Sequence, residues 1–305
     1  MKHVVVLMGG SSTEAEVSVV SGTRVASVLR ELGYTVTVVE PDKNLALRLA
    51  ELSPNVVFNA LHGTYGEDGA VQGLLEIMRI PYTHSGITSS AIAFNKIMTK
   101  QIASQLNIQT PHHKIVQKEA LVDLITNGEH PMPLPYVIKP ISDGSSIGVQ
   151  IVYDISDVDV NALCRDQFLL ETYIPGKELS VAVFKNEALG VLELSYKDRF
   201  ADYNAKYAEG GSTHIIPASI SKEIYDKVAK QSTALHQALG CSVISRSDFK
   251  FDESKGADGL YFLEINTQPG LTFTSMVPDL LAYAGYELKD LIKELIAQAK
   301  CHISV

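Results

Sequence analysis

A strand-like segment near the C-terminal end, YFLEIN at residues 261–266, carries polar side chains among apolar ones. Residues two apart in an extended chain point to the same side, so Phe262, Glu264 and Asn266 share one face. Carboxylate and amide oxygens side by side suit a hard cation such as Mg²⁺. On these residues alone, an edge strand with a solvated face is the favoured alternative.

A second strand-like segment, VISRSDFKF at 243–251, places Arg246, Asp248 and Lys250 on one face. The polar loop between the two segments would close a hairpin centred near Gly256. The pairs that this hairpin would bring opposite each other are Asp248 with Glu264 and Arg246 with Asn266. Three oxygen ligands beside cations predict a magnesium site that also holds phosphate. A cross-strand ladder of salt bridges explains the pattern equally well.

A glycine- and serine-rich turn at residues 143–148 follows Lys139, which ends a strand-like run. The N–H groups and hydroxyls of such a turn can cradle phosphates, and the lysine supplies positive charge. The DGSS sequence is also a common hairpin turn. The pattern is not a Walker A loop, which needs GxxxxGK[ST] at the start of a helix.

The segment GGSSTEAEVS at residues 9–18 opens the first expected helix, where backbone N–H groups favour anions. A dinucleotide-binding turn is a competitor, supported by Glu40 at the end of the second strand, but the GxGxxG spacing is absent. Glu14 lies where a pyrophosphate would be. This residue would either hold a substrate ammonium or cap the helix, which is the commoner role.

Three further residues have both a functional and a structural interpretation. His62 follows the third expected strand, at the carboxyl end of the sheet where ligands usually bind, although a lone histidine is more often structural. Glu171 ends a strand and Glu178 follows a Pro-Gly turn. The two glutamates suit a nucleotide pocket, where a carboxylate accepts hydrogen bonds from the ribose hydroxyls. They suit two solvated turns equally well.

The N-terminal motifs require a sheet to position them. From Lys2 to Pro81, apolar runs alternate with helical segments, and the first helix is expected to end near Leu32. This order predicts a parallel sheet covered by helices on both faces. The expected strands are residues 4–8, 34–40 and 55–61.

Beyond Pro81, residues 94–107 predict one amphipathic helix with Met98, Ile102 and Leu106 on its apolar face. The short strand-like runs that follow predict a mostly antiparallel sheet. The polar stretch that comes next is longer than an ordinary connection. This irregular stretch covers residues 195–214, and helices are expected after it at 221–239 and 287–300.

Composition limits the class of protein. The chain has 305 residues, 46% of them hydrophobic, and a net charge of -9, which argues against nucleic acid or an anionic membrane surface as the main partner. Its three cysteines are far apart and form no CxxC pair, so neither a disulfide framework nor a zinc site is expected. No apolar run approaches the roughly 20 residues of a membrane span. We therefore expect a cytoplasmic protein of two or three compact units.

Together the motifs resemble the D-alanine–D-alanine ligase family of the ATP-grasp superfamily. The segments that carry the resemblance follow the family's order over nearly the whole chain: GGSSTEAEVS, ALHGTYGEDG, VIKPISDGSSIGV, LLETYIPGKE, DYNAKY, SRSDF and LEINTQPG. The resemblance implies α/β and α+β architecture, with an ATP-grasp fold after an N-terminal parallel, Rossmann-like α/β domain. The implied units are a substrate domain at 1–95, a central ATP-grasp subdomain at 96–176, and a C-terminal subdomain with lid and metal site at 177–305.

The resemblance also assigns a nucleotide site. It implies that ATP lies between the central and C-terminal units and that two Mg²⁺ or Mn²⁺ ions bind with it. The implied contacts are Lys96, Lys139 and Ser146 at the phosphates, Glu171 to Ile174 at the adenine, Glu178 at the ribose, and Asp248, Glu264 and Asn266 at the metals.

The implied reaction joins two D-alanine molecules through an acyl phosphate for peptidoglycan precursor synthesis. By this resemblance Glu14, Ser145 and Tyr207 hold the first D-alanine near His62. The oxyanion donors would be Arg246 and the N–H of Gly270, and the ligands of the second carboxylate Lys206 and Ser275. Tyr207 lies in the implied lid and favours D-alanine over D-lactate as the second substrate. A homodimer is also implied.

Alternative functions stay open at this point. A ligase that uses D-lactate or another amino acid would keep the fold and change the nucleophile. A nucleotide-binding regulator without turnover and a dehydrogenase are more distant alternatives.

Overall fold

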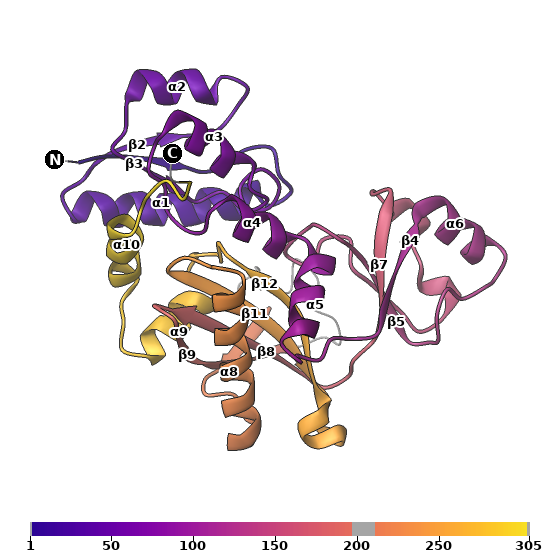
Figure 1. The fold of residues 1–305 in the computed structure, drawn as a ribbon. Coiled ribbons are helices and arrows are strands. Elements are labelled where there is room, and N and C mark those ends of the chain that lie inside the picture. The colour runs from indigo at the N-terminus through magenta and orange to yellow at the C-terminus, as the bar shows by residue number, and fades with distance from the viewer. Residues whose placement is uncertain (1, 197–210, 304–305) are drawn as a thin grey trace.

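The computed structural model describes residues 2–196 and 211–303, organised around three sheets (Figure 1). Lys206 and Tyr207 lie outside the described residues, so their implied roles stay predictions. Each sheet falls within one of the three expected segments of the chain. Within the described part of the chain, no helix is long and apolar enough to cross a membrane.

The N-terminal sheet is parallel, as expected, with strand order β2-β1-β3. Alternate residues of β1 face opposite layers: Val4 and Val6 pack towards α1, and Val5 and Leu7 pack towards α2 and α3. Because both faces are covered, the strand needs no polar side. The elements are β1 (His3–Leu7), α1 (Ala15–Glu31), β2 (Thr35–Val39), α2 (Leu45–Leu52), β3 (Val56–Asn59) and α3 (Ala70–Met78).

The C-terminal helix α10 (Leu288–Ala297) returns to the N-terminal sheet and lies near α1 (Figure 1). Its buried face consists of Leu291, Ile292, Leu295 and Ile296, which belong to the apolar face expected from the sequence. One core cluster thereby joins the first and last parts of the chain. The division at residues 95 and 176 stays a prediction.

The β-rich middle and C-terminal parts form two antiparallel sheets, whereas the sequence predicted one. The four-stranded sheet has order β4-β7-β5-β6, and α6 packs on one of its faces. After Gly176 the chain leaves this sheet, and β8 pairs with β9 and β11 instead of β7. The elements of the first sheet are β4 (His113–Gln117), α6 (Lys118–Thr126), β5 (Tyr136–Pro140), β6 (Gln150–Val152) and β7 (Gln167–Thr172).

The five-stranded sheet has order β10-β9-β8-β11-β12. α8 covers one face, and Ser221 caps it as expected by accepting a hydrogen bond from the N–H of Ile224. α9 covers the other face. The elements are β8 (Lys177–Phe184), β9 (Glu187–Tyr196), β10 (Ser212–Ile215), α8 (Lys222–Ala238), β11 (Ile244–Phe251), β12 (Leu260–Asn266) and α9 (Met276–Tyr283).

Most of the helix expected over 94–107 is confirmed, but its first residue belongs to a separate, preceding helix. Two helices, α4 (Ile87–Phe94) and α5 (Lys96–Gln105), meet at Asn95, whose side chain caps α5 by accepting hydrogen bonds from two backbone N–H groups. The expected apolar face is partly wrong, because Met98 is 47% exposed, whereas Ile102 and Leu106 pack against a core cluster as expected. The buried residues of α5 are Lys96, Thr99, Lys100 and Ala103.

The expected hairpin register is confirmed: β11 and β12 pair with Asp248 opposite Glu264 and Arg246 opposite Asn266. The expected faces of β12 are partly wrong, because a bulge places Leu263 and Glu264 against Asp248 alone. The extra residue reverses the alternation, so Phe262 enters the core while Glu264 faces a cleft. β12 is an edge strand, but its polar side is not simply solvated.

Candidate functional site

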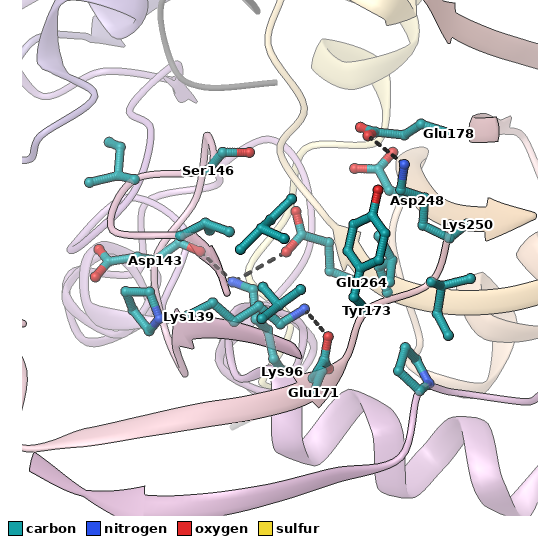
Figure 2. A pocket seen from close by; sticks show the side chains of 18 of the residues that line it. Lys96, Lys139, Asp143, Ser146, Glu171, Tyr173, Glu178, Asp248, Lys250 and Glu264 are labelled. Atoms are coloured by element: carbon teal, nitrogen blue, oxygen red, sulfur yellow. Dashed lines mark hydrogen bonds and ion pairs between the residues drawn. The ribbon is translucent and has the colours of Figure 1, made fainter. Parts of the chain in front are cut away.

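A cleft opens between the two antiparallel sheets, with α5 at its floor (Figure 2). It gathers side chains from the β5–β6 turn, from β7, and from β8, β11 and β12. All six residues expected to bind the nucleotide line this one cleft: Lys96, Lys139, Ser146, Glu171, Ile174 and Glu178. Asp248 and Glu264, two of the three expected metal ligands, line it as well.

A buried charge triad lies beneath the cleft. Glu171 Oε2 lies 2.6 Å from Lys139 Nζ, and its Oε1 lies 2.5 Å from Lys100 Nζ. Burial alone would raise the pKa of Glu171, but the two lysines hold this pKa below its usual value. Burial lowers the pKa of Lys100 to about 8. Glu171 is therefore a buried ionised anchor for Lys139, and its interpretation as a solvated turn residue is wrong.

Sequence reasoning missed Lys100. The sequence spacing does indicate this residue, because Lys100 follows Lys96 by four positions and both therefore lie on the same side of α5. The charged pair was overlooked because Met98, Ile102 and Leu106 suggested a different buried face.

We expect Lys100→Met to lower the free energy of unfolding by about 3 kcal/mol, because breaking a buried ion pair leaves a poorly compensated charge. Nucleotide affinity should also fall, since Glu171 would lose the cation at its Oε1 and hold Lys139 less rigidly through Oε2 alone. Urea unfolding and titration with ATP measure the two effects. Lys114→Met, at an exposed position on β4, is the control and should change neither. Equal stability of the two variants would contradict the anchoring role of Lys100.

The glycine-rich turn is fixed at its base. Lys96 Nζ donates to the carbonyl oxygen of Asp143 at 2.5 Å, and the Asp143 carboxylate accepts two hydrogen bonds from Arg165 at 2.8 and 2.9 Å. The turn joins the antiparallel strands β5 and β6, so it is a hairpin connection, and it also lines the cleft. The interpretation of this turn as a hairpin connection is therefore compatible with its interpretation as a phosphate-binding turn.

Two of the expected metal ligands, Asp248 and Glu264, lie on one side of the cleft, whereas the third, Asn266, does not line it. Asp248 accepts hydrogen bonds from Arg246 Nη2 at 2.9 Å and Ser180 Oγ at 2.5 Å, and Glu264 Oε2 lies 3.2 Å from Lys96 Nζ. Two carboxylates and an amide are a donor set that fits Mg²⁺ together with phosphate oxygens. Ion pairs are present here too, since Lys250 lies 3.8 Å from Glu178 across the strands. The chemistry of these residues thus suits Mg²⁺, and the cross-strand salt bridge lies on the same surface.

A second cavity lies between the N-terminal domain and the five-stranded sheet. All six described residues that were expected to contact the substrates line it: Glu14, His62, Ser145, Arg246, Gly270 and Ser275. Asn266 also lines it. Glu264 and Gly144 line both this cavity and the nucleotide cleft, so the two sites meet at these residues.

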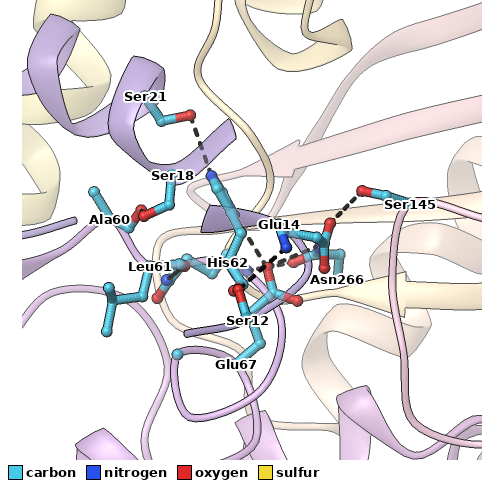
Figure 3. A network of polar contacts seen from close by, with 12 residues as sticks. Ser12, Glu14, Ser18, Ser21, Ala60, Leu61, His62, Glu67, Ser145 and Asn266 are labelled. Atoms are coloured by element: carbon cyan, nitrogen blue, oxygen red, sulfur yellow. Dashed lines mark hydrogen bonds and ion pairs between the residues drawn. The ribbon is translucent and has the colours of Figure 1, made fainter. Parts of the chain in front are cut away.

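Glu14 occupies the N-cap position of α1, but its side chain makes no capping hydrogen bond to the described backbone. It accepts a hydrogen bond from Ser145 Oγ (Figure 3). A Cβ at Gly144 would lie 2.6 Å from Glu14 Oε2, so only glycine lets the turn approach the carboxylate this closely. Burial, with a contribution from Glu67, raises the pKa of Glu14 to about 7.

His62 belongs to a polar network that sequence reasoning found only in part. Its Nδ1 lies 3.2 Å from Glu67 Oε1, and its Nε2 lies 3.1 Å from Ser21 Oγ on α1. Glu67 also lines the cavity. The sequence signal for Glu67 is its place in the segment ALHGTYGEDG, five residues after His62. His62 is thus both a structural histidine and part of the cavity wall.

The loop after β12 closes the cavity against α1. Leu271 N donates to Ser21 Oγ at 3.2 Å, and Arg24 Nη1 donates to the carbonyl oxygens of Leu271 and Thr272 at 3.0 and 2.9 Å. A Cβ at Gly270 would lie 2.9 Å from Ser275 Oγ, so a side chain there would crowd the cavity. The backbone of Gly270 therefore stays accessible at the wall.

Two antiparallel sheets that enclose a lysine-lined cleft, next to a parallel α/β domain, define the ATP-grasp class of proteins. Family models described as the C-terminus and N-terminus of D-ala D-ala ligase match residues 102–297 and 41–85. The chain belongs to the D-alanine–D-alanine ligase family.

Similar proteins cover nearly the full chain. The D-alanine–D-alanine ligase of Zymomonas mobilis is 47% identical over 98% of this chain and 94% of its own. The crystal structure of the Bacillus anthracis D-alanine–D-alanine ligase is 32% identical, with a TM-score of 0.81 over 97% of both chains. A structure of the Bacillus anthracis enzyme complexed with ATP is 29% identical, with a TM-score of 0.79 over 97% of both chains.

Proposed function

We propose that the protein joins two D-alanine molecules into D-alanyl-D-alanine with ATP, releasing ADP and phosphate, for peptidoglycan precursor synthesis. Family membership supports the reaction, and the ATP complex of the Bacillus anthracis relative supports the nucleotide. The observation that carries the proposal is the meeting of the two cavities at Glu264 and Gly144. A phosphoryl group at the end of the cleft can reach a carboxylate in the second cavity only if the two sites are continuous.

In this proposal the cleft binds ATP. Lys96 and Lys139 neutralise the charge of the phosphates, and the turn that contains Ser146 covers them. The carboxylate of Glu178 accepts hydrogen bonds from the ribose hydroxyls. Ile174 and the neighbouring backbone of β7 contact the adenine. Glu171 contributes by anchoring Lys139 at 2.6 Å. Asp248, Glu264 and Asn266 would hold Mg²⁺ or Mn²⁺, which shields charge on the transferred phosphoryl group when bound.

The second cavity binds the two amino acids. Glu14 receives the ammonium of the first D-alanine, aided by the acidic neighbour Glu67 and oriented by Ser145. The carboxylate of that D-alanine accepts the γ-phosphoryl group and becomes an acyl phosphate, which is a far better electrophile than a free carboxylate. Orientation of the two reactants at the junction lowers the entropic barrier of this transfer.

The amine of the second D-alanine then attacks the acyl carbon. Arg246 and the N–H of Gly270 donate to the oxyanion that forms, and fixed donors of this kind commonly account for a factor of roughly 10²–10³ in rate. Ser275 would bind the second carboxylate with Lys206. We further propose a cytoplasmic homodimer, with D-alanine and ATP as its small-molecule partners.

Incubation of the protein with ATP, Mg²⁺, D-alanine and competing D-lactate tests the proposal. We expect equimolar ADP and D-alanyl-D-alanine, with little D-alanyl-D-lactate at neutral pH. Product analysis by mass spectrometry separates the dipeptide from the depsipeptide. Depsipeptide as the main product would assign a different nucleophile, and folded protein that forms neither product would refute the ligase.

A further inference from the structure

A histidine that the sequence analysis did not select lies in the wall of the second cavity. His214 on β10 lines it together with Arg246, Gly270 and Ser275. Its Nδ1 lies 2.6 Å from Oδ2 of Asp279, in the first turn of α9, and its side chain is only 13% exposed. The carboxylate fixes the ring and favours the tautomer with the proton on Nδ1. Nε2 is then the ring nitrogen that can accept a proton.

The proposed ligation, on which this inference rests, requires such a proton acceptor. The second D-alanine is mainly an ammonium ion at neutral pH, since α-amino groups have pKa values of roughly 8 or above. An ammonium nitrogen has no free electron pair for attack on the acyl carbon. One proton must therefore leave before the C–N bond forms.

The other described bases in the cavity wall are engaged. Both ring nitrogens of His62 have partners, Glu14 accepts from Ser145, and Glu264 is paired with Lys96. Glu67 contacts His62. Nε2 of His214, by contrast, makes no hydrogen bond to any residue in the described ranges 2–196 and 211–303.

We propose that His214 accepts, through Nε2, the proton that the second D-alanine must lose, and that Asp279 is its positioning residue. The freed amine forms the C–N bond to the acyl carbon. The C–O bond to the phosphoryl group then breaks, inorganic phosphate leaves with the second proton of the nitrogen, and imidazolium returns the first proton to water. Asp279 stabilises the imidazolium in the interval.

The charge around the pair is mixed. Asp279 faces His214 from α9, and Arg24 on α1 interacts electrostatically with Asp279. Arg246 on β11 and Glu14 at the N-cap of α1 share the cavity, and the residue opposite His214 on β9 is the apolar Leu194. A carboxylate in direct contact is therefore the nearest charge to the histidine, and it favours a ring that gains a proton during the reaction.

His214→Gln tests the proposal, because glutamine still offers a donor to Asp279 and cannot act as a base. We expect kcat for dipeptide formation to fall about 100-fold at neutral pH, a typical contribution of general base catalysis. KM for the second D-alanine should change less than threefold. Asp279→Asn should reduce kcat about tenfold, and His112→Gln, at an exposed position outside both cavities, should leave it unchanged.

Hydroxylamine distinguishes this inference from the proposed function, because it is largely unprotonated at neutral pH and needs no base to trap an acyl phosphate. With ATP and D-alanine, His214→Gln should form the hydroxamate at the wild-type rate. An unchanged kcat for dipeptide formation would overturn the base role. A raised KM for the second D-alanine together with that unchanged kcat would make His214 a ligand of the second carboxylate. Absence of hydroxamate from the wild-type protein would instead refute the ligase.

Discussion

Glu264→Gln should reduce turnover at least about 100-fold while the protein stays folded. Glu264 is the carboxylate shared by the two cavities, and its side chain is 28% exposed on the ligand side. Even residues that only support a metal ligand commonly contribute 10- to 100-fold, so loss of a direct ligand should cost more. Steady-state ADP release at increasing Mg²⁺ concentration measures the effect, and excess Mg²⁺ should restore only part of the activity.

Glu264 is a better test position than Asp248. Asp248 is buried and bound by Arg246 and Ser180, so its replacement would also disturb the sheet. Glu253→Gln, in the exposed connection between β11 and β12, is the matched control and should retain full turnover. Wild-type turnover in Glu264→Gln would contradict the metal role, and loss of the folded state would show that the pair with Lys96 is structural.

The hairpin of β11 and β12 was predictable because its register follows from local spacing. Two alternating segments on either side of one polar loop allow few pairings, and the expected pairs are those that form. The bulge was not predictable, since Phe262, Leu263 and Glu264 alternate acceptably without it. Packing in the core favours the bulge, because it places Phe262 against Phe249 at a distance of 5.5 Å between ring centroids.

Features set by distant parts of the chain escaped prediction. The split into two sheets depends on β8 pairing with β11, about 60 residues later, and no local pattern specifies that partner. The buried face of α5 carries Lys96 and Lys100, whose charges are paired with Glu264 and Glu171 from other elements. The motifs therefore selected residues that line the two cavities, whereas the pairing of buried charges became visible only in three dimensions.

We expect Glu14→Gln to reduce kcat/KM for the first D-alanine about 100-fold, because an amide cannot compensate the substrate ammonium. Loss of one partner from a buried, hydrogen-bonded charge pair typically costs 2–5 kcal/mol of binding, and roughly 2.7 kcal/mol corresponds to 100-fold. Wild-type activity should also decline as pH falls through about 7, where Glu14 gains its proton. Activity of Glu14→Gln that matches the wild type across this range would exclude the ammonium role.

The same substitution should stabilise the protein measured without ATP or D-alanine. The pKa of Glu14 is about 7 in the folded protein, against 4.5 as its ordinary value, so the folded state holds a proton that the unfolded chain releases as pH rises from 4.5 to 7. Above pH 7 this difference amounts to about 3 kcal/mol of lost stability. Glu14→Gln avoids the loss, and urea unfolding should show it to be more stable than the wild type at pH 7.5 and equally stable near pH 4.5. Glu16→Gln, exposed two residues later, should follow the wild type at both values. A gain in stability that accompanies a loss of activity would mean that Glu14 is retained for the substrate and not for the fold.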